Sequence, residues 1–295
     1  MKKLLPEKLA NLTASPLLAK VKDGAAKLLP QAAARPALQL PIPQTPFDKY
    51  RRQKLIKLMR MHELVPYRSV LEIGCGIGDL MLEMSKHQPR ELYGVDGSEE
   101  MIGFARQLLE GTGADLMVAD VRRLPFPEKS FDVVVVMFEL QFLPEEKEME
   151  RVVYEVCRLA RQWVVLVEET AQQESRSNSI ARRTVAAYKE AFKTKRFHLR
   201  RADYLDVSAS QYVFTGRSNP WHWLRWLLSP LLYLMGFPRA WFRPPVTEHE
   251  LPKSRFALFL QQLALPLMTG LDDIVKTGSG ITVMRFERER LFRRG

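Results

Sequence analysis

Three glycines at alternate positions form the segment of the sequence best suited to binding a ligand. Gly74, Gly76 and Gly78 follow the apolar run SVLEI at residues 69–73. Their spacing is G-x-G-x-G and not the G-x-G-x-x-G of dinucleotide-binding loops. Glycine lets the backbone turn sharply and approach a ligand without a Cβ clash. Glu72 precedes the first glycine by two residues, and because its charge would repel a pyrophosphate, it indicates a cationic ligand.

Two aspartates follow the next two strand-like runs. Asp96 comes directly after the run ELYGV at residues 91–95, and Asp120 comes two residues after the run at 114–118. The carboxyl ends of parallel strands meet at one edge of a sheet, where doubly wound folds bind their ligands. An acid after the second strand can accept both hydroxyls of a ribose, and an acid after the third can accept a hydrogen bond from an adenine amine. The two positions therefore predict a nucleoside site.

The elements that must position these residues form an alternating pattern. Apolar runs separated by amphipathic segments are typical of a parallel sheet covered by helices on both faces. We expect strands at residues 69–73, 91–95, 114–118, 131–137, 163–167 and 280–287, and a further strand around 206–214. We expect helices at residues 47–64, 79–86, 99–109, 145–160 and 254–275. The helix at 99–109 begins after Ser98, which we expect to be its N-cap.

Composition divides the chain into four parts. Residues 1–45 form a basic, proline-rich appendage, which is either a loosely docked tail or an amphipathic surface anchor. Residues 46–175 form the α/β core, 176–279 form an apolar and basic insertion, and 280–295 form a closing strand with a basic tail.

The overall composition limits the classes of protein. Of 295 residues 46% are apolar, so a large core can be buried, and two cysteines predict neither a disulfide framework nor a cysteine-rich zinc site. We find no secretory signal, and the longest apolar stretch, 226–238, is too short to span a bilayer. We therefore expect a cytoplasmic protein. The net charge of +11 favours an anionic partner, whether nucleic acid, an acidic membrane surface or a phosphorylated substrate.

Three stretches in order carry a resemblance to a known family. The stretches are VLEIGCGIG, LYGVDGSEEMI and ADVRRLPFPEKSFDVVVVMFELQFL. Together they resemble the class I S-adenosylmethionine-dependent methyltransferases. The resemblance is closest to the methyltransferase type 11 group, which includes the ubiquinone and menaquinone C-methyltransferases. The resemblance covers residues 47–170. It implies a Rossmann-like sheet of seven strands, the last antiparallel, with S-adenosyl-L-methionine as cofactor and no metal.

The resemblance also implies the residues that hold the cofactor. Met101 would pack on the adenine, and Tyr50 would lie on a helix that caps the pocket. The full cofactor set is Tyr50, Glu72, Gly74, Cys75, Gly76, Gly78, Asp96, Gly97, Met101, Asp120, Val121 and Phe138.

The stretch after the fourth strand, residues 138–143, faces the methyl acceptor in proteins that it resembles. It lacks the Asn/Asp-Pro-Pro-aromatic tetrad of nucleic-acid and protein amine methyltransferases. Gln141 stands where many small-molecule enzymes have His or Glu, and its amide cannot accept a proton at neutral pH. The catalytic residue is therefore left open. The candidates for orienting or deprotonating an acceptor are Glu139, Gln141, Tyr50, Glu168, Glu169 and His198.

Two segments of the insertion bear on the acceptor. Residues 176–203 carry nine basic and two acidic residues, which form either an anion-binding surface or a solvated face. Residues 221–242 hold four of the five tryptophans and suit a lid, a dimer contact or a peripheral membrane contact. The N-terminus also suits a peripheral membrane contact. We expect a small-molecule or lipid-like acceptor. Stacking aromatics are sparse in the basic stretch, which disfavours nucleic acid. The alternatives are a methyltransferase of RNA or protein, and a non-catalytic protein that retains the fold.

Overall fold

The computed structural model describes residues 46–176, 180–207 and 280–289, with a few single positions between 230 and 272. The described residues fall into two compact units, each treated by itself. Residues 56–204 and 280–289 belong to the first unit, and residues 46–55, 205–207 and the single positions belong to the second. The boundary lies within helix α3 (Pro46–Met59).

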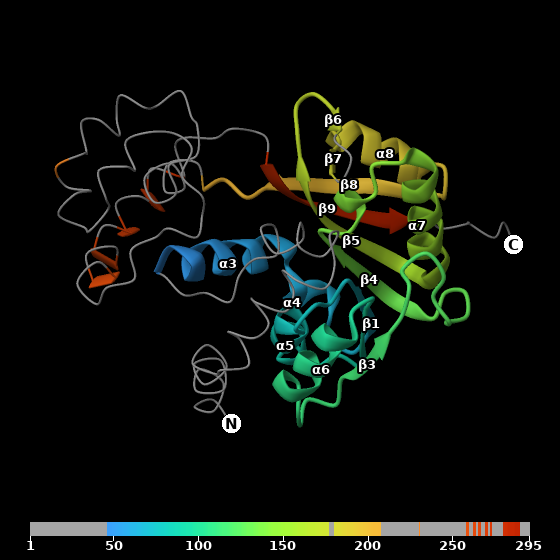
Figure 1. Ribbon diagram of the computed structural model, residues 1–295, viewed down its shortest axis with the longest axis horizontal. Coiled ribbons are helices and arrows are strands. Elements are labelled where there is room, and N and C mark those ends of the chain that lie inside the picture. Colours follow the sequence, from blue (N-terminus) through green and yellow to red (C-terminus); the bar gives the residue numbers. More distant parts are fainter. Residues whose placement is uncertain are drawn as a thin grey trace, which may run out of the picture. The chain divides into compact units, whose positions relative to one another are not determined.

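The first unit is built on a seven-stranded sheet with the strand order β3-β2-β1-β4-β5-β9-β8 (Figure 1). The first five strands are parallel to one another, and β9 runs antiparallel to its neighbours β5 and β8. The strands are β1 (Ser69–Ile73), β2 (Glu91–Asp96), β3 (Asp115–Val118), β4 (Phe131–Met137), β5 (Ala160–Thr170), β8 (Phe197–Tyr204) and β9 (Gly280–Arg288). This topology confirms the predicted Rossmann-like sheet with its antiparallel last strand.

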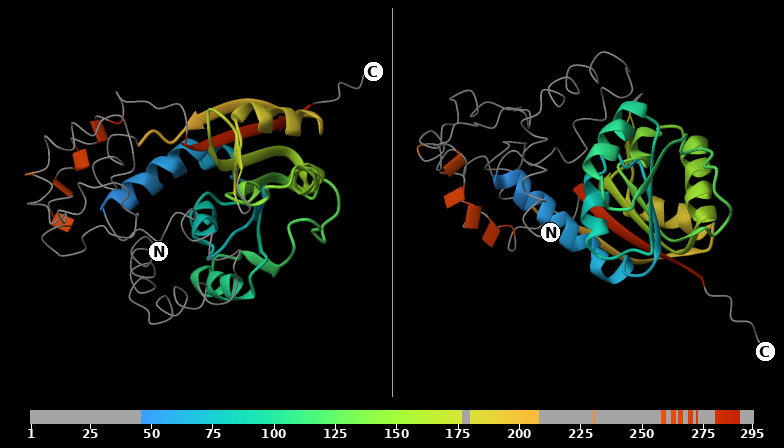
Figure 2. Two further views of the ribbon diagram at one scale, coloured as in Figure 1. Left: turned by 45° about the horizontal axis from the view of Figure 1, so that its top comes forward. Right: turned by 90° about the horizontal axis from the view of Figure 1, so that it is seen from below.

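Helices cover both faces of this sheet. Figure 2 shows α5 (Asp79–Ser85) and α6 (Glu99–Leu108) on one side and α7 (Glu146–Leu159) and α8 (Val185–Lys193) on the other. Shorter elements complete the unit: α4 (Met61–Leu64), the 3-10 turn η1 (Leu140–Phe142), and a hairpin of β6 (Ser175–Arg176) and β7 (Ala181–Arg182).

Sequence pattern explains the main packing. The four consecutive valines 133–136 in β4 are fully buried, as expected for a strand covered on both faces. Helix α7 places Met149, Val152 and Val156 on one stripe, and all three are buried in the core under the sheet. The ring of Phe192 on α8 stacks on Phe286 of β9, with centroids 4.2 Å apart. These contacts hold the helices against the sheet.

The position of the sixth strand corrects our prediction. We expected it around residues 206–214, but the strand is β8 at Phe197–Tyr204; residues 205–207 are not in a strand, and 208–214 lie outside the described residues. The reason is that β8 lies at the edge of this sheet and, among the described strands, pairs only with β9. Edge strands carry charged residues, and Arg200 and Arg201 are exposed there, which hid the strand within the basic stretch.

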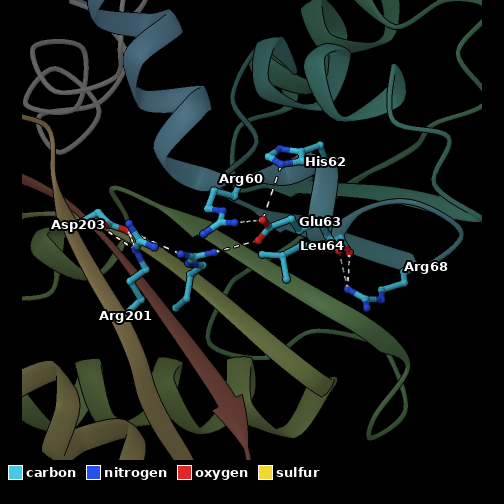
Figure 3. A network of polar contacts seen from close by, with 8 residues as sticks. Arg60, His62, Glu63, Leu64, Arg68, Arg201 and Asp203 are labelled. Atoms are coloured by element: carbon cyan, nitrogen blue, oxygen red, sulfur yellow. Dashed lines mark hydrogen bonds and ion pairs between the residues drawn. The ribbon is translucent and has the colours of Figure 1, made fainter.

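A chain of charged side chains attaches α4 to the last two strands (Figure 3). Glu63 on α4 binds Arg60 and lies 3.6 Å from Arg285 of β9. The mostly buried Arg285 also lies 3.7 Å from Asp203 of β8, which accepts a hydrogen bond from Arg201 at 2.8 Å. Because one buried guanidinium lies between two carboxylates, its charge is compensated on both sides.

Some predictions concern residues that are not described. The appendage at 1–45 and the aromatic segment 221–242, apart from Pro230, lie outside the described residues. Single helical positions between 258 and 272 fall within the helix predicted at 254–275. Within the described part of the chain, each helix is too short or too polar to cross a membrane.

Candidate active site

The glycine loop turns back from β1 onto the end of β2. The backbone N–H groups of Gly74 and Cys75 both donate to the carbonyl of Val95, at 2.9 and 3.0 Å. Gly74, Gly76 and Gly78 have φ angles of 74°, 53° and 78°, in the left-handed region that glycine adopts without strain. Gly78 is also the N-cap of α5. The alternate spacing of the glycines therefore follows from three left-handed backbone positions in one short turn.

Asp96 ties this loop to the second strand. Asp96 is 5% exposed, and its two carboxylate oxygens accept backbone N–H groups, Oδ2 from Gly76 at 3.0 Å and Oδ1 from Ser98 at 2.9 Å. Gly97 is exposed, and a Cβ built on it would meet no atom within 4 Å. Ser98 caps α6, since its hydroxyl accepts the N–H of Met101 at 3.3 Å, which confirms the predicted N-cap.

Glu139 lies across the glycine loop. A Cβ added to Gly74 would stand 2.3 Å from Oε1 and 2.6 Å from Cγ of Glu139. Glu139 is 6% exposed and follows Phe138, a buried residue with a φ of 57°. The turn after β4 and the loop after β1 are thus in contact, so a group bound at one would adjoin the other.

Asp120 stands at the same edge of the sheet, two residues beyond β3. The N–H of Ala119 donates to the carbonyl of Asp96 at 3.0 Å, which places Asp120 next to the end of β2. The Asp120 carboxylate accepts hydrogen bonds from Arg122 at 2.9 to 3.1 Å, and these bonds lower its pKa. Val121 is partly buried against the core.

The edge of the sheet is strongly acidic. Burial raises the pKa of the Cys75 thiol, and the nearby carboxylates of Glu72, Asp96 and Glu139 raise it further. Cys75 therefore stays a neutral thiol that packs within the loop, as a free and buried cysteine. Buried carboxylates around a glycine loop favour a cationic ligand and disfavour a phosphate.

The turn η1, on the acceptor side, is held at both of its ends. The Glu168 carboxyl on β5 accepts the N–H of Leu140 at 2.8 Å and the N–H of Gln141 at 3.3 Å. The guanidinium of Arg183 donates to the carbonyls of Leu140 and Leu143, at 3.0 and 2.7 Å. Arg183 is fully buried. A short turn leaves backbone N–H and carbonyl groups without partners at its two ends. Here one buried side chain accepts from the N–H groups, and another donates to the carbonyls.

Glu168 differs from an ordinary carboxyl group in its ionisation. Its pKa is raised to about 8, and complete burial is the largest cause. The backbone N–H groups of Leu140 and Gln141 lower the pKa, and the Glu139 carboxylate raises it, so about 8 is the net result. Glu168 is therefore mostly neutral at pH 7.

Arg183 was not among the predicted site residues, because it lies within the basic stretch 176–203. No local signal distinguishes it from Arg182, which reaches Glu169 at 3.2 Å and is partly exposed. Tertiary packing places the hairpin of β6 and β7 beside η1. Because of this position, Arg183 is buried and binds the carbonyls of the turn, whereas Arg182 does not.

One catalytic candidate is not brought to this site. His198 pairs with Glu287, which in turn pairs with Trp163 near the start of β5, so His198 lies at the amino-terminal end of the parallel strands, opposite the glycine loop. Tyr50 belongs to the second unit, where its hydroxyl donates to Asp272 at 3.1 Å and accepts from Lys54 at 3.1 Å. Its place relative to the glycine loop stays a prediction. The remaining candidates, Glu139, Gln141, Glu168 and Glu169, all lie on η1 and its flank or at the end of β5.

Comparison with known proteins relates this geometry to a family. Residues 70–162 match the family model described as "Methyltransferase domain". The phosphatidylethanolamine N-methyltransferase of Cereibacter sphaeroides is 39% identical over 111 residues, which cover 36% of this chain and 52% of that protein. The demethylmenaquinone methyltransferase of Porphyromonas gingivalis is 37% identical over 100 residues, which cover 32% of this chain and 40% of that protein. The chain spans about half or less of the length of these curated relatives.

A sterol enzyme and a solved structure extend the comparison. The cycloartenol-C-24-methyltransferase of Arabidopsis thaliana is 26% identical over 133 residues, which cover 39% of this chain and 40% of that protein. One chain in a complex of the Haloferax volcanii Trm112 methyltransferase activator with a methyltransferase shares the fold, with a TM-score of 0.50 and 16% identity over 84% of this chain and 97% of that chain. Residues 70–162 therefore form a class I S-adenosylmethionine-dependent methyltransferase domain.

Proposed function

We propose that the protein transfers a methyl group from S-adenosylmethionine to a small acceptor that is apolar or lipid-like. The observation that carries the proposal is the bridge from Asp96 to Gly76, set within a group of buried carboxylates. The named relatives act on a phospholipid amine, a menaquinone precursor and a sterol, which supports an acceptor of that general kind.

The residues present fit this cofactor. S-adenosylmethionine carries an ammonium and a sulfonium, and the loop is flanked by the carboxylates of Glu72, Asp96 and Glu139. The exposed backbone at Gly97, where a Cβ would meet nothing, leaves space beside Asp96 for a ribose. Gly74 and Gly76 bring the backbone itself to the ligand, and Met101 lies half-buried in the first turn of α6, where it could contact an adenine.

The chain's own residues would bind and orient the reactants. When bound, S-adenosylmethionine would supply an activated methyl group for transfer to the acceptor atom. Glu139 would lie between the cofactor loop and the acceptor, and the braced turn η1 would form one wall of the acceptor site. Placement in a dry pocket can supply much of the rate, so an essential base is not required.

Calorimetric titration of S-adenosylmethionine into the full chain tests the first half of this proposal, and transfer of a labelled methyl group to a lipid extract tests the second. We expect micromolar binding and label in the organic phase. Absence of binding to folded protein would contradict the proposal. Label found in RNA or protein would favour a macromolecular acceptor. Binding of RNA that weakens steeply as the salt concentration rises would favour it too.

Three expectations stay predictions. They are the role of residues 221–242 as a lid, dimer contact or membrane contact, the membrane contact of the N-terminus, and the place of Tyr50 near the cofactor.

A further inference from the structure

Gln141 on η1 is a fully buried amide whose two ends differ in their contacts. Its Oε1 accepts the backbone N–H of Glu169 at 3.2 Å, whereas its Nε2 has no hydrogen-bond partner among the residues that the structure describes. A backbone N–H can only donate, so this contact fixes which end of the amide is the oxygen. The NH2 group is therefore a buried donor that lacks an acceptor.

The surroundings keep this donor in place. A buried donor without a partner is unfavourable, and a loose turn would rotate until the donor found one. Here Glu168 accepts the N–H groups of Leu140 and Gln141, and Arg183 donates to the carbonyls of Leu140 and Leu143, so the backbone that carries the amide is held at both ends. The fold thus maintains an unsatisfied donor by bracing the backbone that carries it.

The position of the donor relates it to the cofactor loop. Gln141 is two residues from Glu139, whose side chain contacts Gly74 closely enough to exclude a Cβ there. The turn that carries the amide is thus the one that adjoins the loop proposed to bind S-adenosylmethionine. A molecule that receives the methyl group must also adjoin that loop.

We infer that the Gln141 NH2 group donates a hydrogen bond to an oxygen of the methyl acceptor, next to the atom that is methylated. The acceptor is then an apolar molecule with a phenolic or alcoholic oxygen or a ring carbonyl, such as a lipid quinol. An ammonium headgroup offers only donors and would meet another donor at this position. The inference rests on the proposed function and narrows its acceptor from any apolar or lipid-like molecule to an oxygen-bearing one.

The first test is independent of activity. Transverse-relaxation-optimised NMR of ¹⁵N-labelled full chain detects the side-chain amide of Gln141, which is assigned by its loss in Gln141→Glu. A 1,4-naphthoquinol with a short prenyl chain is added under reducing conditions in the presence of S-adenosylhomocysteine. We expect the Nε2 protons to move downfield as the new hydrogen bond forms. Resonances that stay in place at saturating quinol would indicate an amide that is satisfied by internal water, and would overturn the inference, as would a failure of the quinol to bind.

The second test uses the chemistry of the substitution. Gln141→Glu keeps an oxygen for the N–H of Glu169 but replaces the NH2 with a second oxygen. The introduced carboxyl would lie near Glu139, Glu168, Glu169 and Arg183 and would donate only when protonated. We expect the KM for the quinol to rise about tenfold or more at pH 8.5 and to recover as the pH falls, with the cofactor Kd unchanged.

Gln173→Glu is the matched control, because it makes the same change at an exposed position after β5. We expect its KM to equal that of the unsubstituted protein at every pH. A KM for Gln141→Glu that does not depend on pH, or a wild-type preference for phosphatidylethanolamine vesicles over the quinol, would overturn the inference. If the protein does not bind S-adenosylmethionine, the proposed function itself fails, whereas cofactor binding without an effect at Gln141 defeats the inference alone.

Discussion

The carboxylate of Asp96 accepts a hydrogen bond from the backbone N–H of Gly76 at 3.0 Å, so a single side chain joins the end of β2 to the glycine loop. Its other oxygen accepts the N–H of Ser98. Asp96→Asn leaves one acceptor oxygen and turns an NH2 toward one of these two donors. We expect the affinity for S-adenosylmethionine to fall by about tenfold or more, as measured by calorimetry.

Asp115→Asn is the control for this change, since Asp115 is exposed at the start of β3, the opposite end of that strand from the site. It should bind the cofactor like the unsubstituted protein. Equal losses in both variants would mean that net charge, and not the bridge to Gly76, sets the affinity.

Gly74 combines a left-handed backbone with a close approach, and the two effects can be separated. Gly111 has nearly the same φ, 78° against 74°, but a Cβ there would meet no atom within 4 Å. Gly111→Ala should therefore lower the free energy of unfolding by about 1 kcal/mol and leave cofactor binding intact. Gly74→Ala should lower the free energy of unfolding by more than Gly111→Ala, because its methyl group would displace Glu139. It should also weaken cofactor binding. If the two substitutions had equal effects on stability in chemical denaturation and on cofactor binding in calorimetry, the contact with Glu139 would not account for the role of Gly74.

Asp132, at the start of β4, gives a prediction about acid stability. Its carboxylate accepts the N–H and the hydroxyl of Ser69 at 3.0 and 3.1 Å and pairs with Arg161. Burial works against the ionised form, but the bonds from Ser69 and Arg161 together hold its pKa below 3.8.

A carboxyl with a lowered pKa in the folded state stabilises the protein above its unfolded pKa, and that contribution is lost as the pH falls through the folded value. Asp132→Asn should lower the free energy of unfolding by about 1 to 3 kcal/mol at pH 7 in urea titrations. The difference from the unsubstituted protein should shrink below pH 4. A difference that stays constant from pH 7 to pH 3 would show that ionisation of Asp132 plays no part.

Glu168 predicts the opposite pH dependence. Its folded pKa of about 8 lies above the ordinary value of 4.5, so the folded state binds the extra proton between these two values. The contribution of Glu168 is then fully present below pH 4.5 and declines as the pH rises toward 8. Glu168→Gln should flatten the slope of unfolding free energy against pH in this range, whereas Glu174→Gln, at an exposed position, should not. An unchanged slope in the Glu168 variant would mean that this carboxyl is ionised throughout.

The sequence predicted those features that depend on residues close together in the chain. The parallel strands, the glycine loop, Asp96 with its capped helix and the acid after β3 each have a local signature, because strand pattern and turn chemistry are set by neighbouring residues. The edge strand β8 was misplaced because its charges resemble those of a solvated helix face. The brace of Glu168 and Arg183 could not be predicted, since it depends on which backbone groups of η1 packing brings to them.

The place of β9 in the sheet has a consequence for biosynthesis. Residues 280–288 form the strand between β5 and β8, and among the described strands β8 pairs with no other. While the ribosome is still making residues 205–279, β5 has an open edge and β8 has no partner. The sheet can close only when the last strand emerges, so its folding ends with a pairing of high sequence separation, which is slow. A nascent chain stalled before residue 280 would expose the apolar edge of β5, and would be a substrate for chaperones or proteases.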